Sequence, residues 1–186
     1  MLRDVVVANC SSMASSGVQS LSGLGGAISV RDAAILQTLD TRLEGNTARV
    51  AGGAVAVTGN TAEAWLIRTT LTRNVASGSF EIQGGGGAIA LLGMSGQMTL
   101  SESVMSNNVA VASGGGAFAM PSTRESDDDP LPKIEIVAST VSGNTAGAGG
   151  CLACLGCSPG TMVLGSGAVV TECRAAFGGC VSTVDA

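Results

Sequence analysis

The chain has 186 residues, of which 45% are hydrophobic, 12% are charged and 28 are glycine, and its net charge is −5. This composition excludes a disordered chain, and the length allows one domain with its own core. Eight Arg and one Lys are scattered along the sequence, which argues against nucleic-acid binding, and no apolar run reaches the ~20 residues of a membrane span.

A short phrase recurs six times along the sequence: two glycines, a small residue, a large apolar residue and another small residue. Its copies begin at residues 25, 52, 86, 115, 149 and 178. The second glycines lie 27 to 34 residues apart, a period that is typical of repeat architectures. Glycine pairs in every repeat disfavour the helical repeats of similar length.

Between these copies lie segments that alternate apolar and polar residues and are rich in β-branched types. They are residues 35–39, 65–69, 98–101 and 134–137. Such segments predict strands, about three in each repeat. One repeat cannot bury its own apolar face, so the repeats are predicted to stack at ~4.8 Å through parallel strand pairing. The sequence therefore predicts an all-β solenoid, a parallel β-helix of about six rungs.

An asparagine follows an apolar residue by three positions in five of the six repeats. These asparagines are Asn9, Asn46, Asn74, Asn108 and Asn144, and Cys173 takes the place in the last repeat. We expect them to form a column at one corner, where their amides bond to each other and to the adjacent rungs. The alternative is that they are ordinary turn asparagines.

Alternation after each glycine pair assigns residues to the two faces of a strand. The inward column is predicted to be Ile28, Val55, Ile89, Phe118, Leu152 and Val181. The predicted outward residues are Ala27, Ala54, Ala88, Ala117, Ser29, Ala56, Ala90, Ala119 and Ala153. This Ala/Ser face would be flat and small, and it is a candidate surface for a protein partner.

The two repeated phrases resemble those of the polymorphic outer membrane proteins, in which Gly-Gly-Ala-(Ile/Val/Leu) alternates with Phe-x-x-Asn. The first motif is nearly literal at Gly26-Ala27-Ile28, Gly53-Ala54-Val55 and Gly87-Ala88-Ile89, whereas Leu, Met or Val replaces the Phe of the second. The resemblance implies a right-handed parallel β-helix with a surface or adhesive role and no active site. It implies an extracellular or cell-surface location.

The cysteine run Cys151-x-x-Cys154-x-x-Cys157 has the spacing that opens some iron–sulfur sites. However, Cys151 and Cys154 are an odd number of residues apart and should point to opposite faces of a strand. We expect disulfides or buried thiols instead, and no metal or cofactor. Cys151 and Cys180 each follow a glycine pair, so a disulfide between stacked rungs is predicted there, while Cys154–Cys157 is a competing pair that can coexist with it. Cys10 is expected to be free or paired outside the chain.

Catalysis on this scaffold needs clustered carboxylates or a positioned base. The acidic residues Asp32, Asp40, Glu63, Glu102 and Glu172 are predicted to share no column, and the chain has no His. The acidic run 127–129, within the loop 122–132, is a weak Ca²⁺ candidate because it lacks the glycine and distal glutamate of an EF-hand. One column of hydroxyl side chains is in phase with the inward apolar residues and is therefore predicted to be buried, which argues against an ice-binding face. Its members are Thr41, Thr69, Ser103 and Ser139.

We therefore expect a non-enzymatic structural or adhesion segment. The alternative is a carbohydrate-binding or carbohydrate-cleaving β-helix of the pectate-lyase type. Residues 1–186 are expected to form a single domain that belongs to a larger protein or assembly. Neither residues 1–9 nor residues 182–186 resemble a cap, so flanking polypeptide or other subunits are expected to cover both open ends.

Overall fold

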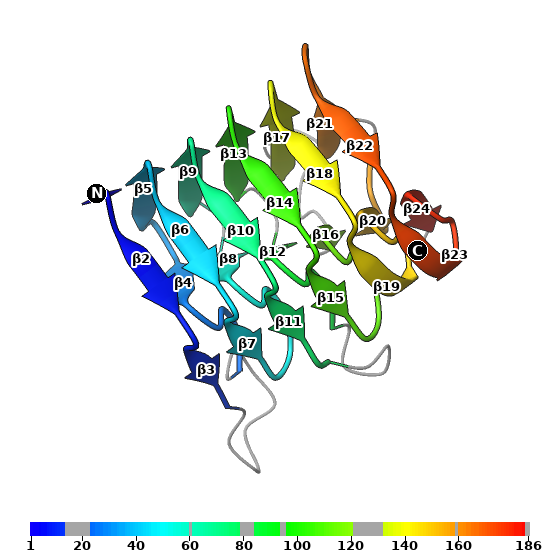
Figure 1. Cartoon of the computed structure of the whole chain (residues 1–186), viewed down its shortest axis with the longest axis horizontal. Coiled ribbons are helices and arrows are strands. Elements are labelled where there is room, and N and C mark those ends of the chain that lie inside the picture. The colour runs from blue at the N-terminus through cyan, green and yellow to red at the C-terminus, as the bar shows by residue number, and fades with distance from the viewer. Residues whose placement is uncertain are drawn as a thin grey trace.

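The protein is a right-handed parallel β-helix of six rungs, as a computed structural model shows (Figure 1). The structure describes residues 1–13, 23–59, 61–78, 84–93, 96–120, 132–158 and 160–184. Four parallel sheets of six strands run along the solenoid, and each rung contributes one strand to each sheet. The predicted fold class and rung number are thereby confirmed, although a rung has four strands and not three.

The sheets are named A to D in the order in which the chain visits them. Sheet A contains β1 (Leu2–Arg3), β5 (Ile35–Leu39), β9 (Glu63–Ile67), β13 (Gln97–Ser101), β17 (Lys133–Val137) and β21 (Met162–Leu164). Sheet B contains β2 (Val6–Ala8), β6 (Arg42–Glu44), β10 (Thr70–Thr72), β14 (Val104–Ser106), β18 (Thr140–Ser142) and β22 (Val169–Thr171). Sheet C contains β3 (Ser11–Ser12), β7 (Thr47–Ala48), β11 (Val75–Ala76), β15 (Val109–Ala110), β19 (Thr145–Ala148) and β23 (Arg174–Phe177). Sheet D contains β4 (Ile28–Arg31), β8 (Val55–Thr58), β12 (Ile89–Leu92), β16 (Ala117–Met120), β20 (Leu152–Leu155) and β24 (Val181–Val184).

Three corners of the helix turn through a residue in the left-handed region, and these residues stack from rung to rung. Between sheets A and B they are Asp4, Asp40, Arg68, Glu102 and Ala138. Between B and C they are Asn9, Gly45, Arg73, Asn107, Gly143 and Glu172. Between C and D they are glycines: the first glycine of the repeated phrase in five rungs and, in the fourth rung, the glycine just before it, which gives Gly25, Gly52, Gly86, Gly114, Gly149 and Gly178. Positive φ is least costly for glycine, which explains why the C–D corner repeats it so strictly.

The core is a narrow stack of aliphatic columns inside the four sheets. Its central members include Leu43, Leu66, Leu71, Leu100 and Met105, all with essentially no exposed surface. Successive rungs place like residues over one another, as Leu43, Leu71 and Met105 show in sheet B. The stack buries a continuous apolar interior that no single rung could bury alone.

In the fourth rung, the strand register of sheet D shows that the predicted inward and outward residues were wrong. Three glycines stand there, and Gly114 takes the left-handed corner position, so Ile89 pairs with Ala117 and Ala90 with Phe118. Phe118 therefore points outward, and Ala117 occupies the inward column that we predicted for Phe118.

The Ala/Ser face that we predicted is not an exposed surface. Ala54 and Ala88 pack in the core, because the residue after the glycine pair also turns inward at the corner, and Ala117 and Ala119 pack there because of the shifted register. The outward column of sheet D is Ser29, Ala56, Ala90, Phe118, Ala153 and Ser182. Its middle members are buried too, since Ala56 and Ala90 pack against Leu24 and Ala51. The proposal of a protein partner on this face is therefore dropped.

Candidate functional site

A ladder of four asparagines runs through the B–C corner. In the last three, the Oδ1 atom accepts two hydrogen bonds from the asparagine of the rung before it: Asn108 Oδ1 accepts from the backbone N of Asn74 (2.9 Å) and from its Nδ2 (3.0 Å). The same pattern joins Asn46 to Asn74 and Asn108 to Asn144. Each Nδ2 also donates to a backbone carbonyl, as Asn74 does to Leu43 (3.0 Å). All four side chains are fully buried, and every amide oxygen and nitrogen among them is paired.

Asn9 lies outside this ladder, contrary to the prediction. Val7 and not Val6 pairs with Leu43, so Cys10 takes the ladder position and donates its backbone N–H to Asn46 Oδ1 (3.0 Å). Asn9 instead occupies the left-handed corner position, with φ of 56°. The ladder of Asn46, Asn74, Asn108 and Asn144 is thus bounded by a cysteine in the first rung, Cys10, and by another in the last, Cys173.

A second ladder, of hydroxyls, lies at the A–B corner. Ser103 Oγ accepts from the backbone N of Thr69 (2.8 Å), and Ser139 Oγ accepts from the backbone N of Ser103 (3.0 Å). Both hydroxyls donate to carbonyls of their own rungs and are buried, as the sequence pattern predicted for this column. Both ladders satisfy corner N–H groups that strand pairing alone leaves open.

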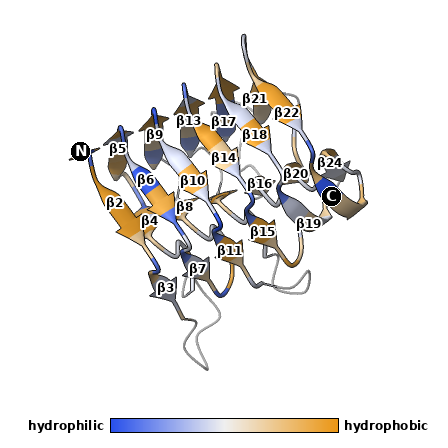
Figure 2. Cartoon of the chain, in the orientation of Figure 1, coloured by the Kyte–Doolittle hydropathy of each residue, from blue (hydrophilic) through white to orange (hydrophobic). Residues whose placement is uncertain are grey.

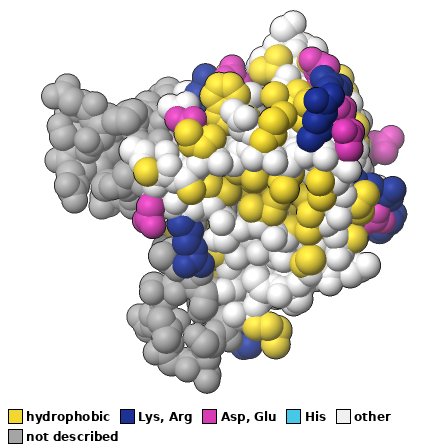
Figure 3. All heavy atoms as spheres, turned by 90° about the vertical axis from the view of Figure 1, so that its left-hand side faces the viewer, with side chains coloured by type: hydrophobic (Ala, Val, Ile, Leu, Met, Phe, Trp, Pro, Cys, Tyr) yellow, Lys and Arg dark blue, Asp and Glu magenta, His cyan; other side chains and the backbone are white. Residues whose placement is uncertain are grey.

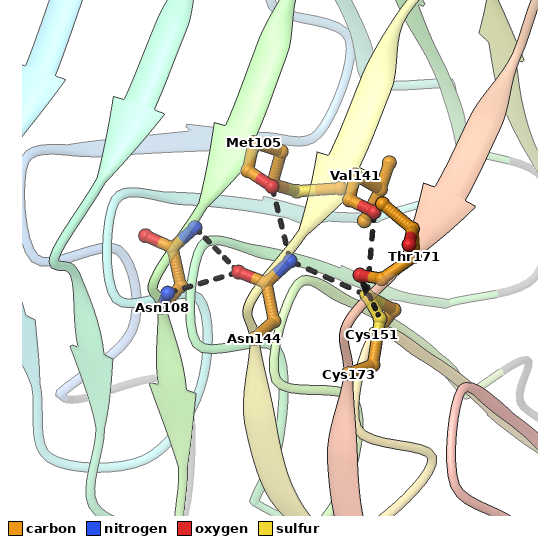
Figure 4. Close-up of a disulfide and its surroundings, with 7 residues drawn as sticks. All are labelled: Met105, Asn108, Val141, Asn144, Cys151, Thr171 and Cys173. Atoms are coloured by element: carbon orange, nitrogen blue, oxygen red, sulfur yellow. Dashed lines mark hydrogen bonds between the residues drawn. A yellow bond between two sulfur atoms is a disulfide. The ribbon is translucent and has the colours of Figure 1, made fainter.

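Cys151 forms a disulfide with Cys173 and not with Cys180 (Figure 4). The column assignment itself holds, because the backbone N of Cys151 donates to the carbonyl of Cys180 (3.0 Å). At this corner, however, the Cys151 side chain points into the interior toward Asn144, whose Nδ2 lies 3.5 Å from Cys151 Sγ. Cys173 stands at the end of the asparagine ladder with a Cα–Cα distance to Cys151 of 5.4 Å. Cys180 is a free thiol.

The remaining cysteines follow the other expectations of the sequence. Cys154 and Cys157 are disulfide-bonded with a Cα–Cα distance of 5.8 Å, and Cys10 is free and exposed. Cys151 and Cys154 both face the core, because the corner bend breaks the alternation that we expected to separate them. In the described part of the chain, no three His, Cys, Asp or Glu side chains are grouped to hold a metal ion. The acidic run 127–129 lies outside the described residues.

Acidic residues at the A–B corner share a column with Arg68, which forms an ion pair with one of them. Arg68 donates to both carboxylate oxygens of Asp40, at 2.7 and 2.9 Å. These hydrogen bonds lower the pKa of Asp40 below its ordinary value, and the same contact raises the pKa of Arg68. Glu102 lies one rung further in the same column, so Asp40 and Glu102 do share a column, contrary to the prediction, but Arg68 stands between them. An exposed carboxylate held ionised by Arg68 is unsuited to donate a proton to a glycosidic oxygen.

Two hollows of the surface lie at the C-terminal rungs. One of ≈ 360 Å³ is apolar and lies on the outer side of sheet D, lined by Phe118, Ala153, Leu155 and Phe177 among others. A second, of ≈ 500 Å³, is polar and lies at the B–C corner, lined by Asn107, Glu172 and Arg174 among others. In the described residues neither hollow holds a pair of carboxylates, and both open next to the last rung.

Comparison with known proteins adds no relative. No family model matches the chain, and neither a curated protein nor a solved structure matches it. Among the described residues, none of the elements is a helix of the length and apolarity that crossing a membrane requires.

Proposed function

We propose that this chain is a non-enzymatic structural or adhesive β-helix segment that acts through protein or surface contacts. One observation carries the proposal: the buried asparagine side chains of the B–C corner and the buried serine side chains of the A–B corner are hydrogen-bonded in ladders that join successive rungs. The amides of Asn46, Asn74, Asn108 and Asn144 satisfy one another, and the carboxylate of Asp40 is engaged by Arg68. This arrangement supports a scaffold better than a reacting centre.

The repeated phrases support the same role. Their similarity to the repeats of polymorphic outer membrane proteins favours an adhesive function and an extracellular or cell-surface location. The two disulfides, Cys151–Cys173 and Cys154–Cys157, agree with an oxidising compartment.

A carbohydrate-binding role is the second candidate, and one residue favours it. Trp65 is 46% exposed on the outer face of sheet A, where its Nε1 donates to Glu63 (3.2 Å). Gln37 and Thr99 flank it in the neighbouring rungs. An exposed aromatic ring among polar side chains offers an apolar face to a sugar ring and hydrogen bonds to its hydroxyls.

A glycan array combined with a reducing-sugar assay separates these candidates. The structural role predicts no release of reducing ends from polysaccharides and no glycan signal that depends on Trp65. The matched variants are Trp65→Ala and Ile35→Ala, which remove exposed apolar groups from the same face of sheet A. Glycan binding that Trp65→Ala alone abolishes would establish the carbohydrate-binding role, and polysaccharide cleavage would overturn the non-enzymatic one.

A further inference from the structure

Three cysteines meet where the fifth rung stacks on the sixth. Cys151 of the fifth rung is bonded to Cys173, which holds the ladder position of the sixth rung, with a Cα–Cα distance of 5.4 Å. Cys180 stacks directly on Cys151, because its carbonyl accepts the backbone N–H groups of both Cys151 (3.0 Å) and Leu152 (2.9 Å). One disulfide is thus shared among three sulfur atoms, and Cys180 carries the free thiol.

Cys180 belongs to a column whose side chains face the interior. The C–D corner turns in the same way in both rungs, since Gly149 and Gly178 have φ of 56° and 60°. Side chains that precede Cys180 in this column pack in the core: Ala54, Ala88 and Cys151. Adjacent rungs place equivalent Cα atoms ~4.8 Å apart, inside the range of about 4.4–6.8 Å that a disulfide tolerates. Cys151 therefore has two cysteines within reach in the sixth rung.

Thiols in solution have poor access to the Cys151–Cys173 bond. Cys151 has essentially no exposed surface, and Cys173 packs against the core. The strand β22, which leads to Cys173, is coloured mostly as hydrophobic in Figure 2. The rate of thiol–disulfide exchange depends on access, so a thiol that already lies beside the bond is the best-placed nucleophile.

We propose that the Cys151–Cys173 and Cys151–Cys180 disulfides interconvert by exchange within one molecule. The thiolate of Cys180 attacks Cys151 Sγ, the new S–S bond forms as the old one breaks, and Cys173 leaves as a thiolate that takes up the proton lost by Cys180. The exchange requires no oxidant or reductant, because the number of disulfides does not change. Cys173 Sγ lies 3.1 Å from the carbonyl oxygen of Thr171, which accepts the S–H of the released thiol (Figure 4).

The exchange changes which part of the sixth rung lies inside a covalently closed loop. A bond to Cys173 leaves β23 outside the loop, whereas a bond to Cys180 encloses it. Both bonds join the fifth rung to the sixth, and the cost of loop closure rises only slowly with loop length, so the two isomers should be similar in stability. Phe177 of β23 lines the apolar hollow on sheet D, so the exchange sets how firmly one wall of that hollow is held.

The cysteine of the first rung has no such neighbour in its own rung. Cys10 holds the ladder position of the rung that faces the viewer in Figure 3, but the C–D column of that rung carries Ala27. Cys10 is therefore expected to take no part in the exchange, and it serves as an internal control for alkylation.

Disulfide mapping of a Cys154→Ser/Cys157→Ser variant tests the proposal, once circular dichroism shows that it folds like the parent chain. Acid stops the exchange, because the thiolate is the attacking species, and a maleimide then marks the free thiols. In native buffer both isomers should be found, with either Cys180 or Cys173 alkylated and Cys10 alkylated in every molecule. Each isomer, separated in acid and returned to native buffer, should regenerate the same mixture at a rate independent of protein concentration. In urea the third pairing, Cys173–Cys180, should appear as well.

Two locked variants give the matched comparison. Cys173→Ser should form the Cys151–Cys180 bond, whereas Cys180→Ser should keep Cys151–Cys173, and the amides of β23 should exchange with deuterium several-fold more slowly in Cys173→Ser. If the double variant does not fold, the same peptides are mapped in the parent chain.

Cys151–Cys173 as the only isomer, with Cys180 alkylated in every molecule, would overturn the proposal. A Cys173–Cys180 bond in native buffer, or a rate that rises with protein concentration, would do the same. None of these results bears on the non-enzymatic role, which the glycan and cleavage assays test separately.

Discussion

Gly85 lies directly against the ring of Phe118, and a Cβ atom at position 85 would come within 2.6 Å of Phe118 Cγ. The two residues occupy facing columns on the outer side of sheet D, where a large side chain in one column is matched by the absence of one in the other. This pairing explains how an outward-pointing phenylalanine remains buried.

Gly85→Ala should destabilise the fold by roughly 1–3 kcal/mol, the usual cost of overpacking. In a Phe118→Ala background the loss from Gly85→Ala should be smaller, because alanine lacks the Cγ and Cδ1 atoms that the new methyl group meets, and the backbone oxygen of Ser113 at 2.7 Å accounts for the part that remains. Urea unfolding of the two single variants and the double variant gives the coupling energy. Gly179→Ala is the control, since a Cβ there meets nothing within 4 Å. Strictly additive effects would contradict the proposed contact.

Asn108→Ala should be among the most destabilising substitutions in the chain. It removes the acceptor of Asn74 and the donor to Asn144, and each buried polar group left without a partner costs ~1–3 kcal/mol, so a loss of about 3 kcal/mol or more is expected. Chemical denaturation measures it.

Asn107→Gly is the matched control for Asn108→Ala. Asn107 is exposed, and its φ of 55° suits glycine, so the loss should be small. Equal losses at positions 107 and 108 would mean that the ladder contributes nothing specific.

The sequence predicts the ladder well but not where it ends. The middle rungs align unambiguously because each ladder asparagine follows an apolar residue by three positions. These apolar residues are Leu43, Leu71, Met105 and Val141. At the start, the run Val5-Val6-Val7 permits two alignments, and only the strand pairing selects Val7 with Cys10. The three glycines at 114–116 create the same ambiguity, which shifts Phe118 from the core to the outer face.

The disulfide partner of Cys151 depends on the direction in which its side chain points at the C–D corner. The alternation of residues between the two faces of a strand does not predict this direction, because it does not hold at a corner. A usable signal was nevertheless present, because Cys173 stands where the other rungs carry an asparagine. A residue in that column faces the interior, where the side chain of Cys151 also lies.

Reduction of the Cys151–Cys173 bond should lower stability by about 3 kcal/mol, as expected for a link between residues separated by 22 positions. Thermal unfolding with and without reductant measures the difference. Cys154→Ser/Cys157→Ser removes the short disulfide and should leave most of this sensitivity to reductant. Cys180→Ser should change it little, because that thiol is free. Loss of the sensitivity in Cys180→Ser would show that Cys180 is the true partner.

The Asp40–Arg68 pair should make stability sensitive to acid. Because Arg68 lowers the pKa of Asp40, its contribution is present above the ordinary carboxyl pKa and is lost as pH falls through the lowered native value. Asp40→Asn should therefore differ from the wild type in melting temperature at neutral pH and converge with it in strong acid. Glu172→Gln removes a similar corner charge that has no ion pair in the described chain, and it serves as the control. A difference that persists unchanged in acid would contradict the assignment.

The bond between Cys151 and Cys173 also makes the two ends of the solenoid differ in their resistance to mechanical unfolding. It joins the fifth rung to the sixth, so peeling that starts at the C-terminal end meets a covalent stop at Cys173. In the described chain no disulfide joins the first rung to the second. A force applied between the ends would therefore unwind the oxidised molecule from its N-terminal rung, and reduction would open a second point of entry.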